Sequence, residues 1–230
     1  NVNGLCFDLW VSLDHPVTDH ETGEQVCGLC EFDPGAGEDA VSLLVSPVGE
    51  GMTEELVLST FGHELGHAVF DAPGWIADSK VAPGLFDTPG QTHRQAYRTT
   101  THDVGHLTFS GASPAQDEGL LARIVEAERE KEKRIAEFRA NEFMGSLLVP
   151  RRRLVEAVME MAPKYDLTLV ARPDLLEDDA PTTFTVKADG PFGDFDLENL
   201  QKAIGKRFGV HGRFIKVRMA RYGLLADGAS

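Results

Sequence analysis

The sequence is poor in cysteine and contains no long apolar run. Three cysteines among 230 residues are few and odd in number, which argues against a disulfide scaffold. No stretch of about 18 apolar residues occurs, which excludes a transmembrane helix. The start, NVNGLCFDLW, lacks a basic region followed by an apolar core, so no signal peptide is expected. These absences predict a protein of the reducing cytoplasm with no membrane partner.

Basic residues are scarce as well. The chain has 22 Lys and Arg against 37 Asp and Glu, a net charge of −15 and a pI near 4.9. Phosphate repels such a surface, so binding of nucleic acid over the whole chain is not expected. The exception is segment 201–226, which contains seven Lys and Arg residues and no acidic residue.

Short apolar and β-branched runs predict a β-rich start. They lie at Leu5–Leu13, Gln25–Phe32 and Ala40–Val45, with turn-rich segments between them. Connections this short cannot carry a parallel crossover, so we expect an antiparallel sheet.

A helix is expected over 53–70, because its apolar residues follow a helical period and Pro73 and Gly74 follow its end. Residues 71–116 hold many Gly, Pro, Thr and His and show no period. We therefore expect a long irregular insertion loop there.

The rest of the chain is mainly helical in pattern. A helical stretch, as one helix or two, is expected over 117–149, where Pro150 ends it. A helix, two short strands and a last helical pair follow. We predict an α+β protein with two domains. In residues 1–150 a small antiparallel sheet packs on the helix over 53–70, and residues 151–230 form an α/β subdomain that ends in the basic pair.

That basic pair, within 201–226, has the charge and shape of a helix-turn-helix, with Gly209 and Gly212 in its turn. DNA binding is one interpretation. We favour the other, in which the positive element docks on the acidic remainder of the chain or meets an acidic partner.

One motif carries chemistry. His63-Glu64-Leu65-Gly66-His67 is an H-E-x-x-H sequence on the expected helix, where four residues bring the two imidazoles to one face. Two such imidazoles can bind one zinc ion. The plainer alternative is a surface pair of histidines, but the apolar flanks favour a buried helix, where histidine needs a partner. Gly66 leaves room beside the metal face for a neighbouring strand or a substrate.

Glu64 points about 100° away from His63 and is poorly placed to join the ligands. It can instead bond a water on the metal, which is the role of the base in a metalloprotease. Zinc lowers the pKa of such a water to about 7, and the carboxylate takes its proton.

A third zinc ligand must come from elsewhere in the chain. Metzincins place it six residues after the second histidine; Pro73 stands there, so that class is excluded. Asp71 is one alternative, although it lies at the end of the same helix.

Glu137 is the better candidate, because it lies on an otherwise apolar helical face and such a carboxylate needs a cation. The alternative for Glu137 is an ion pair with Arg134 or Arg139. The other members of its face are Ala140, Asn141, Met144 and Leu148.

HELGHAVF, followed by E-x-x-A-N-x-F over 137–143 and then LLVP, resembles the ImmA/IrrE-type metallo-endopeptidases. These are small cytoplasmic zincins of bacteria, phages and mobile elements. The closing stretch, LENLQKAIGKRFGVHGRFIKVRMARYGLL, is similar to the family's final helices. Met144 departs from the family, which usually has Ala there, and residues 71–116 look like an insertion.

The resemblance implies a zincin-like domain with Zn²⁺ as cofactor. His63, His67 and Glu137 would be its ligands and Glu64 its general base. It also implies cleavage of a regulatory, repressor-like protein in a stress response or in mobile-element induction. The rival hypothesis is a DNA- or partner-binding regulator whose zinc site is structural or vestigial.

Two weaker patterns remain. Cys27 and Cys30 form a CxxC that, with Cys6 and His15 or His20, resembles a zinc site, but a predicted strand sends the pair to opposite faces. We interpret these cysteines as small buried residues.

His102 and His106 repeat the four-residue spacing within a loop-like context. A polar loop is the simplest interpretation. A second metal site is another, and a role of His93, Tyr97, His102 or His106 in stabilising an oxyanion is a third.

Overall fold

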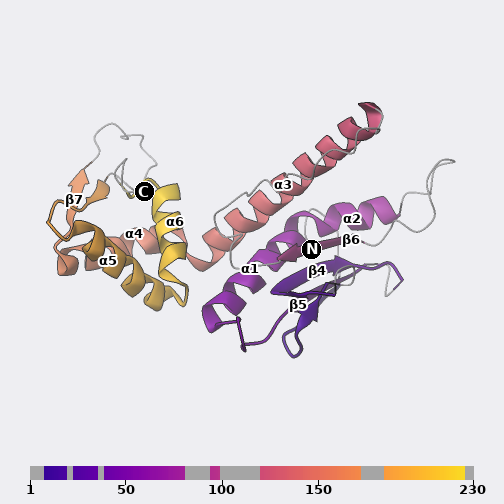
Figure 1. Ribbon diagram of the computed structural model, residues 1–230, viewed down its shortest axis with the longest axis horizontal. Coiled ribbons are helices and arrows are strands. Elements are labelled where there is room, and N and C mark those ends of the chain that lie inside the picture. Colours follow the sequence, from indigo (N-terminus) through magenta and orange to yellow (C-terminus); the bar gives the residue numbers. More distant parts are fainter. Residues whose placement is uncertain are drawn as a thin grey trace. The chain divides into compact units, whose positions relative to one another are not determined.

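The computed structural model describes residues 8–19, 23–35, 39–80, 94–98, 120–171 and 184–225 (Figure 1). The fold is α+β, as the sequence predicts. The chain divides into two compact units, which are taken in turn below. The first comprises residues 1–53 with 59–144, and the second comprises 54–58 with 145–230.

A four-stranded sheet forms the centre of the first unit, with strand order β1-β5-β4-β6. β4 is antiparallel to both of its neighbours, β5 and β6, whereas β1 is parallel to β5. A separate antiparallel ladder joins β2 to β3. The strands are β1 (Asp8–Ser12), β2 (Val17–Thr18), β3 (Gln25–Val26), β4 (Gly28–Phe32), β5 (Ala40–Val45) and β6 (Arg94–Arg98).

The expected all-antiparallel sheet is therefore wrong in one pairing. β5 inserts between β1 and β4 instead of adding beyond β4. The chain between Ser12 and Ala40 contains the β2–β3 ladder and β4. It is long enough to return β5 beside β1 in the parallel sense, which a single short turn could not do.

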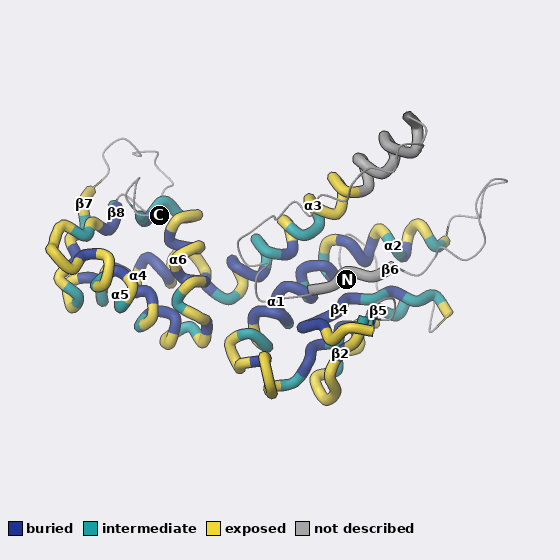
Figure 2. The backbone as a smooth tube through the Cα atoms, viewed as in Figure 1, coloured by how far each residue is buried: buried dark blue, intermediate teal, exposed yellow. Residues whose placement is uncertain are grey.

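Alternation along β5 shows which face of the sheet is more deeply buried. Val41, Leu43 and Val45 are fully buried, and the residues between them are only partly so. On one face Cys30, Phe32 and Val41 pack with apolar residues of two helices. On the other face Leu29 packs with Val17 and Val26. Because both faces are covered, β4 is buried almost throughout (Figure 2).

The helices on the first face are α1 (Glu54–Phe70) and α2 (Ala72–Ser79). Glu54 and Glu55 occupy the first turn of α1, where the helix dipole favours anions. α1 ends where the sequence predicts. The expectation of an irregular segment after it is wrong for 72–79 and for 94–98, which form α2 and β6. Pro73 stops one helix but suits the first turn of the next.

A long helix, α3 (Leu120–Leu148), crosses α1. The expected helical stretch is thus a single helix that ends before Pro150. The two backbones approach closely at Gly66 and Ala140. The rings of Phe70 and Phe143 meet edge to face beside that contact, 5.7 Å between centroids. Gly66 therefore leaves room for a helix and not for a strand or a substrate.

The second unit contains the predicted helix, strand pair and closing helical pair. α5 and α6 are joined by a three-residue turn in which Gly209 adopts a left-handed conformation, φ 71°. Arg218 is buried over the ring of Tyr222, whose hydroxyl donates to the carbonyl of Val149. The elements are α4 (Arg151–Met161), the 3₁₀ turn η2 (Ala162–Tyr165), β7 (Thr168–Ala171), β8 (Phe184–Lys187), α5 (Gly193–Phe208) and α6 (Gly212–Arg221).

None of the described helices combines the length and the apolar character that a membrane span requires.

Candidate metal centre

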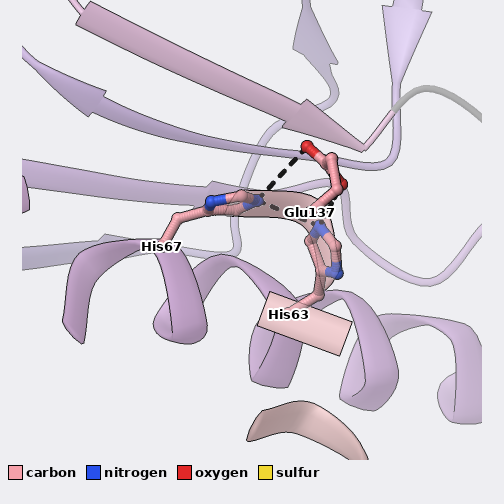
Figure 3. Close-up of side chains that lie close together, drawn as sticks. All are labelled: His63, His67 and Glu137. Atoms are coloured by element: carbon pink, nitrogen blue, oxygen red, sulfur yellow. Dashed lines mark hydrogen bonds and ion pairs between the residues drawn. The ribbon is translucent and has the colours of Figure 1, made fainter. Parts of the chain in front are cut away.

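α1 brings the two histidines of the H-E-x-x-H motif together inside the protein (Figure 3). His63 is 2% exposed and His67 is completely buried. Their Nε2 atoms lie 3.2 Å apart, and the rings meet nearly edge to face at 74°. The four-residue spacing therefore brings the Nε2 atoms of the two rings close together, as the sequence predicts.

Glu137 reaches this point from α3. Its Oε2 lies 3.2 Å from Nε2 of His63, and its Oε1 lies 3.5 Å from Nε2 of His67. The three side chains offer ligand atoms that all lie within 4.8 Å of one another. This His, His, Glu group can hold a metal ion with nitrogen and oxygen ligands, a set that suits zinc.

The outer nitrogens of both rings have acceptors. Nδ1 of His67 donates to Oδ2 of Asp71 over 2.7 Å, and Nδ1 of His63 donates to Oδ1 of Asn141 over 3.2 Å. A carboxylate only accepts hydrogen bonds, so the proton of His67 is assigned to Nδ1 on that ground. The Nε2 lone pairs are then left to face the centre.

The acceptor atoms at this centre show whether a metal ion fits there. Two nitrogen lone pairs and a carboxylate converge, and each of the three is an acceptor when the Nδ1 atoms carry the protons. Acceptors this close repel unless a cation lies among them. The donor set is therefore built for a positive charge, and it fits zinc.

Without a metal that charge is a proton. Burial alone would lower the pKa of His67, but hydrogen bonds to Asp71 and Glu137, with the negative charges of Glu64 and Glu137, raise it to about 10. Burial would likewise raise the pKa of Glu137. Its hydrogen bonds to His63 and His67 and their positive charge instead lower it to about 2. The metal-free centre thus holds an imidazolium beside a carboxylate.

Glu64 is completely buried and lies against the sheet. A Cβ added to Gly28 of β4 would stand 3.0 Å from Cγ and 3.1 Å from Oε1 of Glu64, and would overlap Thr60. Glycine is thus needed at this point of β4. Burial raises the pKa of the Cys30 thiol, and the negative charge of Glu64 adds to that rise. The same charge adds to the rise in the pKa of His67 that its hydrogen bonds cause.

Asp71, the alternative third ligand, proves to be a partner of His67 instead. Arg139 pairs with Asp71, not with Glu137, since its Nη2 lies 2.5 Å from Oδ1 of Asp71. The sequence does not predict the contacts of Asp71 with His67 and with Arg139. The four-residue step from His67 to Asp71 was the available signal, whereas nothing in the sequence pairs Asp71 with Arg139.

The remaining candidates lie apart from this group or outside the described residues. Cys27 and Cys30 are both buried, as expected, and neither belongs to the His, His, Glu group. His15 is exposed. Tyr97 lies on β6, and only its backbone is described. Outside the described residues lie Cys6, His20, His93, His102 and His106.

Comparison with known proteins gives the chain no family by similarity. No protein-family model matches it, and no curated protein is significantly similar to it. The geometry of the site is therefore the main ground for a functional proposal.

Proposed function

We propose that the protein is a cytoplasmic zinc-dependent endopeptidase of the zincin type, which cleaves a regulatory, repressor-like protein. The observation that carries the proposal is the convergence of His63, His67 and Glu137, with the buried Glu64 on the next position of the same helix. A structural zinc site usually has four protein ligands, whereas three leave a position for water or substrate.

The chain's own residues divide the chemistry among them. His63, His67 and Glu137 would hold the metal, while Asp71 and Asn141 orient the two rings. Zinc, when bound, polarises a peptide carbonyl and makes water more acidic. Glu64 is the group that accepts a proton at its carboxylate and returns it to the leaving amine.

The sheet supports a peptide as the substrate. β4 contacts Glu64 through Gly28. Within the described residues β6 pairs with β4 and is the edge strand on that side of the sheet. An extended peptide can add to such an edge through main-chain hydrogen bonds. The choice of a repressor as substrate rests on the resemblance to ImmA/IrrE-type endopeptidases alone.

The test uses Glu64→Gln and a peptide library prepared from a denatured proteome, with new termini detected by mass spectrometry. Wild type should generate new termini in the presence of zinc. The variant should bind zinc as wild type does and generate none above background. Equal cleavage by the two proteins would remove Glu64 as the base, and no cleavage by wild type would count against the proposal.

One observation favours a second candidate, a DNA- or partner-binding regulator with a structural zinc site. Among the basic residues of 201–226, Lys202 pairs with Glu198 and Arg207 with Glu160, each over 2.7 Å. The exposed residues of α6 recur with helical spacing, so they form one mostly basic face. That face consists of Arg213, Lys216, Val217, Ala220 and Arg221.

This second candidate predicts binding of a DNA duplex that weakens steeply with salt and is lost when Arg213, Lys216 and Arg221 are all changed to Ala. The endopeptidase proposal predicts that the same triple variant cleaves peptides as wild type does. Binding of the duplex equally well by both proteins would exclude α6 as the binding face.

A further inference from the structure

A buried carboxylate connects the metal centre to a residue that touches none of its ligand atoms. The side chain of Asp71 is 7% exposed and uses its two oxygens for different helices. Oδ2 accepts from Nδ1 of His67 on α1, and Oδ1 accepts from Nη2 of Arg139 on α3. Arg139 is itself 45% exposed, so it reaches the site from the protein surface.

The backbone of Asp71 is held in place by the corner between α1 and α2. Its N–H donates to the carbonyl of His67, and its own carbonyl accepts from Gly74 and Trp75. The remaining freedom of the carboxylate is rotation about its side-chain bonds. Arg139 restricts that rotation, because its bond to Oδ1 leaves Oδ2 directed at His67.

The balance of charge around His67 also favours a role for Arg139. Glu64 and Asp71, which are buried, and Glu137, which is partly buried, bring three carboxylates close to His67. A divalent metal balances two of their charges and the guanidinium of Arg139 the third. Buried charge is costly unless it is paired, so Asp71 needs this cation even when the metal is bound.

We propose that Arg139 is a positioning residue of the metal centre. It holds the carboxylate of Asp71 where it receives the Nδ1 proton of His67, and this keeps the Nε2 lone pair of His67 on the metal. The inference rests on the metal site of the proposed function. It deepens that function by making a surface-reaching ion pair a determinant of zinc affinity.

A purely structural ion pair would tie α3 to the corner of α1 and α2 without affecting the metal. The two roles differ in what they predict. A structural pair changes the stability of the metal-free protein, whereas a positioning residue changes zinc affinity and does so only through Asp71.

The experiment compares Arg139→Met, Arg139→Lys, Asp71→Asn and the double variant Asp71→Asn with Arg139→Met. Arg207→Met is the control, because Arg207 is 51% exposed, close to the 45% of Arg139, and forms an ion pair over 2.7 Å with Glu160, an exposed carboxylate remote from the metal ligands in sequence. Zinc affinity is measured by competition with a chromogenic chelator, and the absorption of the Co²⁺ form reports ligand geometry. Denaturant unfolding of the metal-free proteins shows that each variant folds.

Loss of a residue that orients a metal ligand costs about 10- to 100-fold in metal affinity. We expect a loss of about that size for Arg139→Met, with an altered Co²⁺ spectrum, a smaller loss for Arg139→Lys and none for Arg207→Met. The double variant should bind zinc about as weakly as Asp71→Asn alone, because both changes break the same chain of contacts.

Zinc affinity of Arg139→Met equal to that of Arg207→Met would overturn the inference. So would losses that simply add in the double variant, because Arg139 would then act independently of Asp71. If these effects appear but wild type cleaves no peptide, the endopeptidase proposal alone fails. If wild type cleaves and Arg139→Met keeps its zinc affinity, the positioning role alone fails.

Discussion

Gly66 of α1 lies against the backbone of Ala140 of α3 so closely that a Cβ on Gly66 would stand 2.8 Å from Cα of Ala140. This contact sets the distance between the helix that carries both histidines and the helix that carries Glu137. The metal centre therefore depends on a glycine that offers no ligand.

The first prediction concerns this contact. Gly66→Ala should push α3 away from α1, carry Glu137 with it and weaken zinc binding at least tenfold. It should also destabilise the metal-free protein by about 1–3 kcal/mol, as overpacking does. Chelator competition and denaturant unfolding measure the two effects. Gly74→Ala on α2 is the control, since a Cβ there meets no atom within 4 Å. Equal behaviour of the two variants would show that the close approach does not position Glu137.

The second prediction separates the proposed base from the ligands. Gly28→Ala should displace both Thr60 and Glu64, because the added Cβ would overlap the side chain of Thr60 and lie 3.0 Å from Cγ of Glu64. Peptide cleavage should fall at least tenfold while one zinc stays bound, because the atoms nearest to that Cβ belong to Thr60 and Glu64 and not to the three ligands. Gly190→Ala, where a Cβ meets nothing within 4 Å, should change neither property. Full cleavage by Gly28→Ala would argue against this position of Glu64.

The third prediction is a proton count. His67 holds a proton up to a pKa of about 10 in the metal-free protein, and zinc must displace it, whereas Glu137 is already ionised at its pKa of about 2. At pH 8 zinc binding should therefore release about one proton from His67. Because His67 must lose its proton, the apparent affinity for zinc should rise about tenfold per pH unit, until about pH 10. Calorimetric titration in buffers of different ionisation enthalpy gives the number of protons released per zinc bound.

The same titration has an internal control. Asp71→Asn removes the negative charge from the acceptor whose hydrogen bond raises the pKa of His67, so this variant should release less than one proton at pH 8. Identical proton release by the two proteins would show that Asp71 does not hold His67 protonated.

The same pKa predicts how stability of the metal-free protein depends on pH. His67 is raised above its ordinary value of 6.5, so the folded state binds this proton more tightly than the unfolded state does. The stability that this contributes is complete below about pH 6.5 and is lost as pH rises toward 10. Urea unfolding across this range should show a larger decline in wild type than in His67→Ala. Parallel curves would contradict the shift.

The fourth prediction concerns metal removal. A ligand that binds only the folded state stabilises it by about 2.7 kcal/mol when present at 100 times its dissociation constant. A chelator should therefore lower the melting temperature of zinc-loaded wild type and leave that of His63→Ala unchanged. Equal shifts in the two proteins would mean that the stabilising metal binds elsewhere.

Local sequence patterns predict the candidate metal centre better than they predict the order of strands in the sheet. The helical period places His63 and His67 on one face, and the apolar face around Glu137 indicates a carboxylate that needs a cation. The sequence therefore predicts that these three residues come together, and the structure confirms it. The position of β5 between β1 and β4 depends on packing of distant segments, which no short sequence pattern encodes. The partnership of Asp71 with Arg139 likewise arises only when α3 crosses α1.

Pro73 shows how one residue supports two interpretations. It predicts the end of the helix over 53–70, and α1 does end at Phe70. It also lies in the first turn of α2, so the chain turns at Asp71 and continues as a helix. That corner fixes the backbone of the residue that orients His67, and a local pattern of Gly and Pro gave no sign of it.

The most direct measurement is zinc content per chain, by elemental analysis of protein purified without chelators and supplied with zinc. Wild type should hold about one zinc. His63→Ala and Glu137→Ala should hold almost none, whereas Glu132→Ala, an exposed acid on the same helix α3, should match wild type. Wild type without zinc, or Glu137→Ala with a full equivalent, would contradict a metal centre formed by His63, His67 and Glu137.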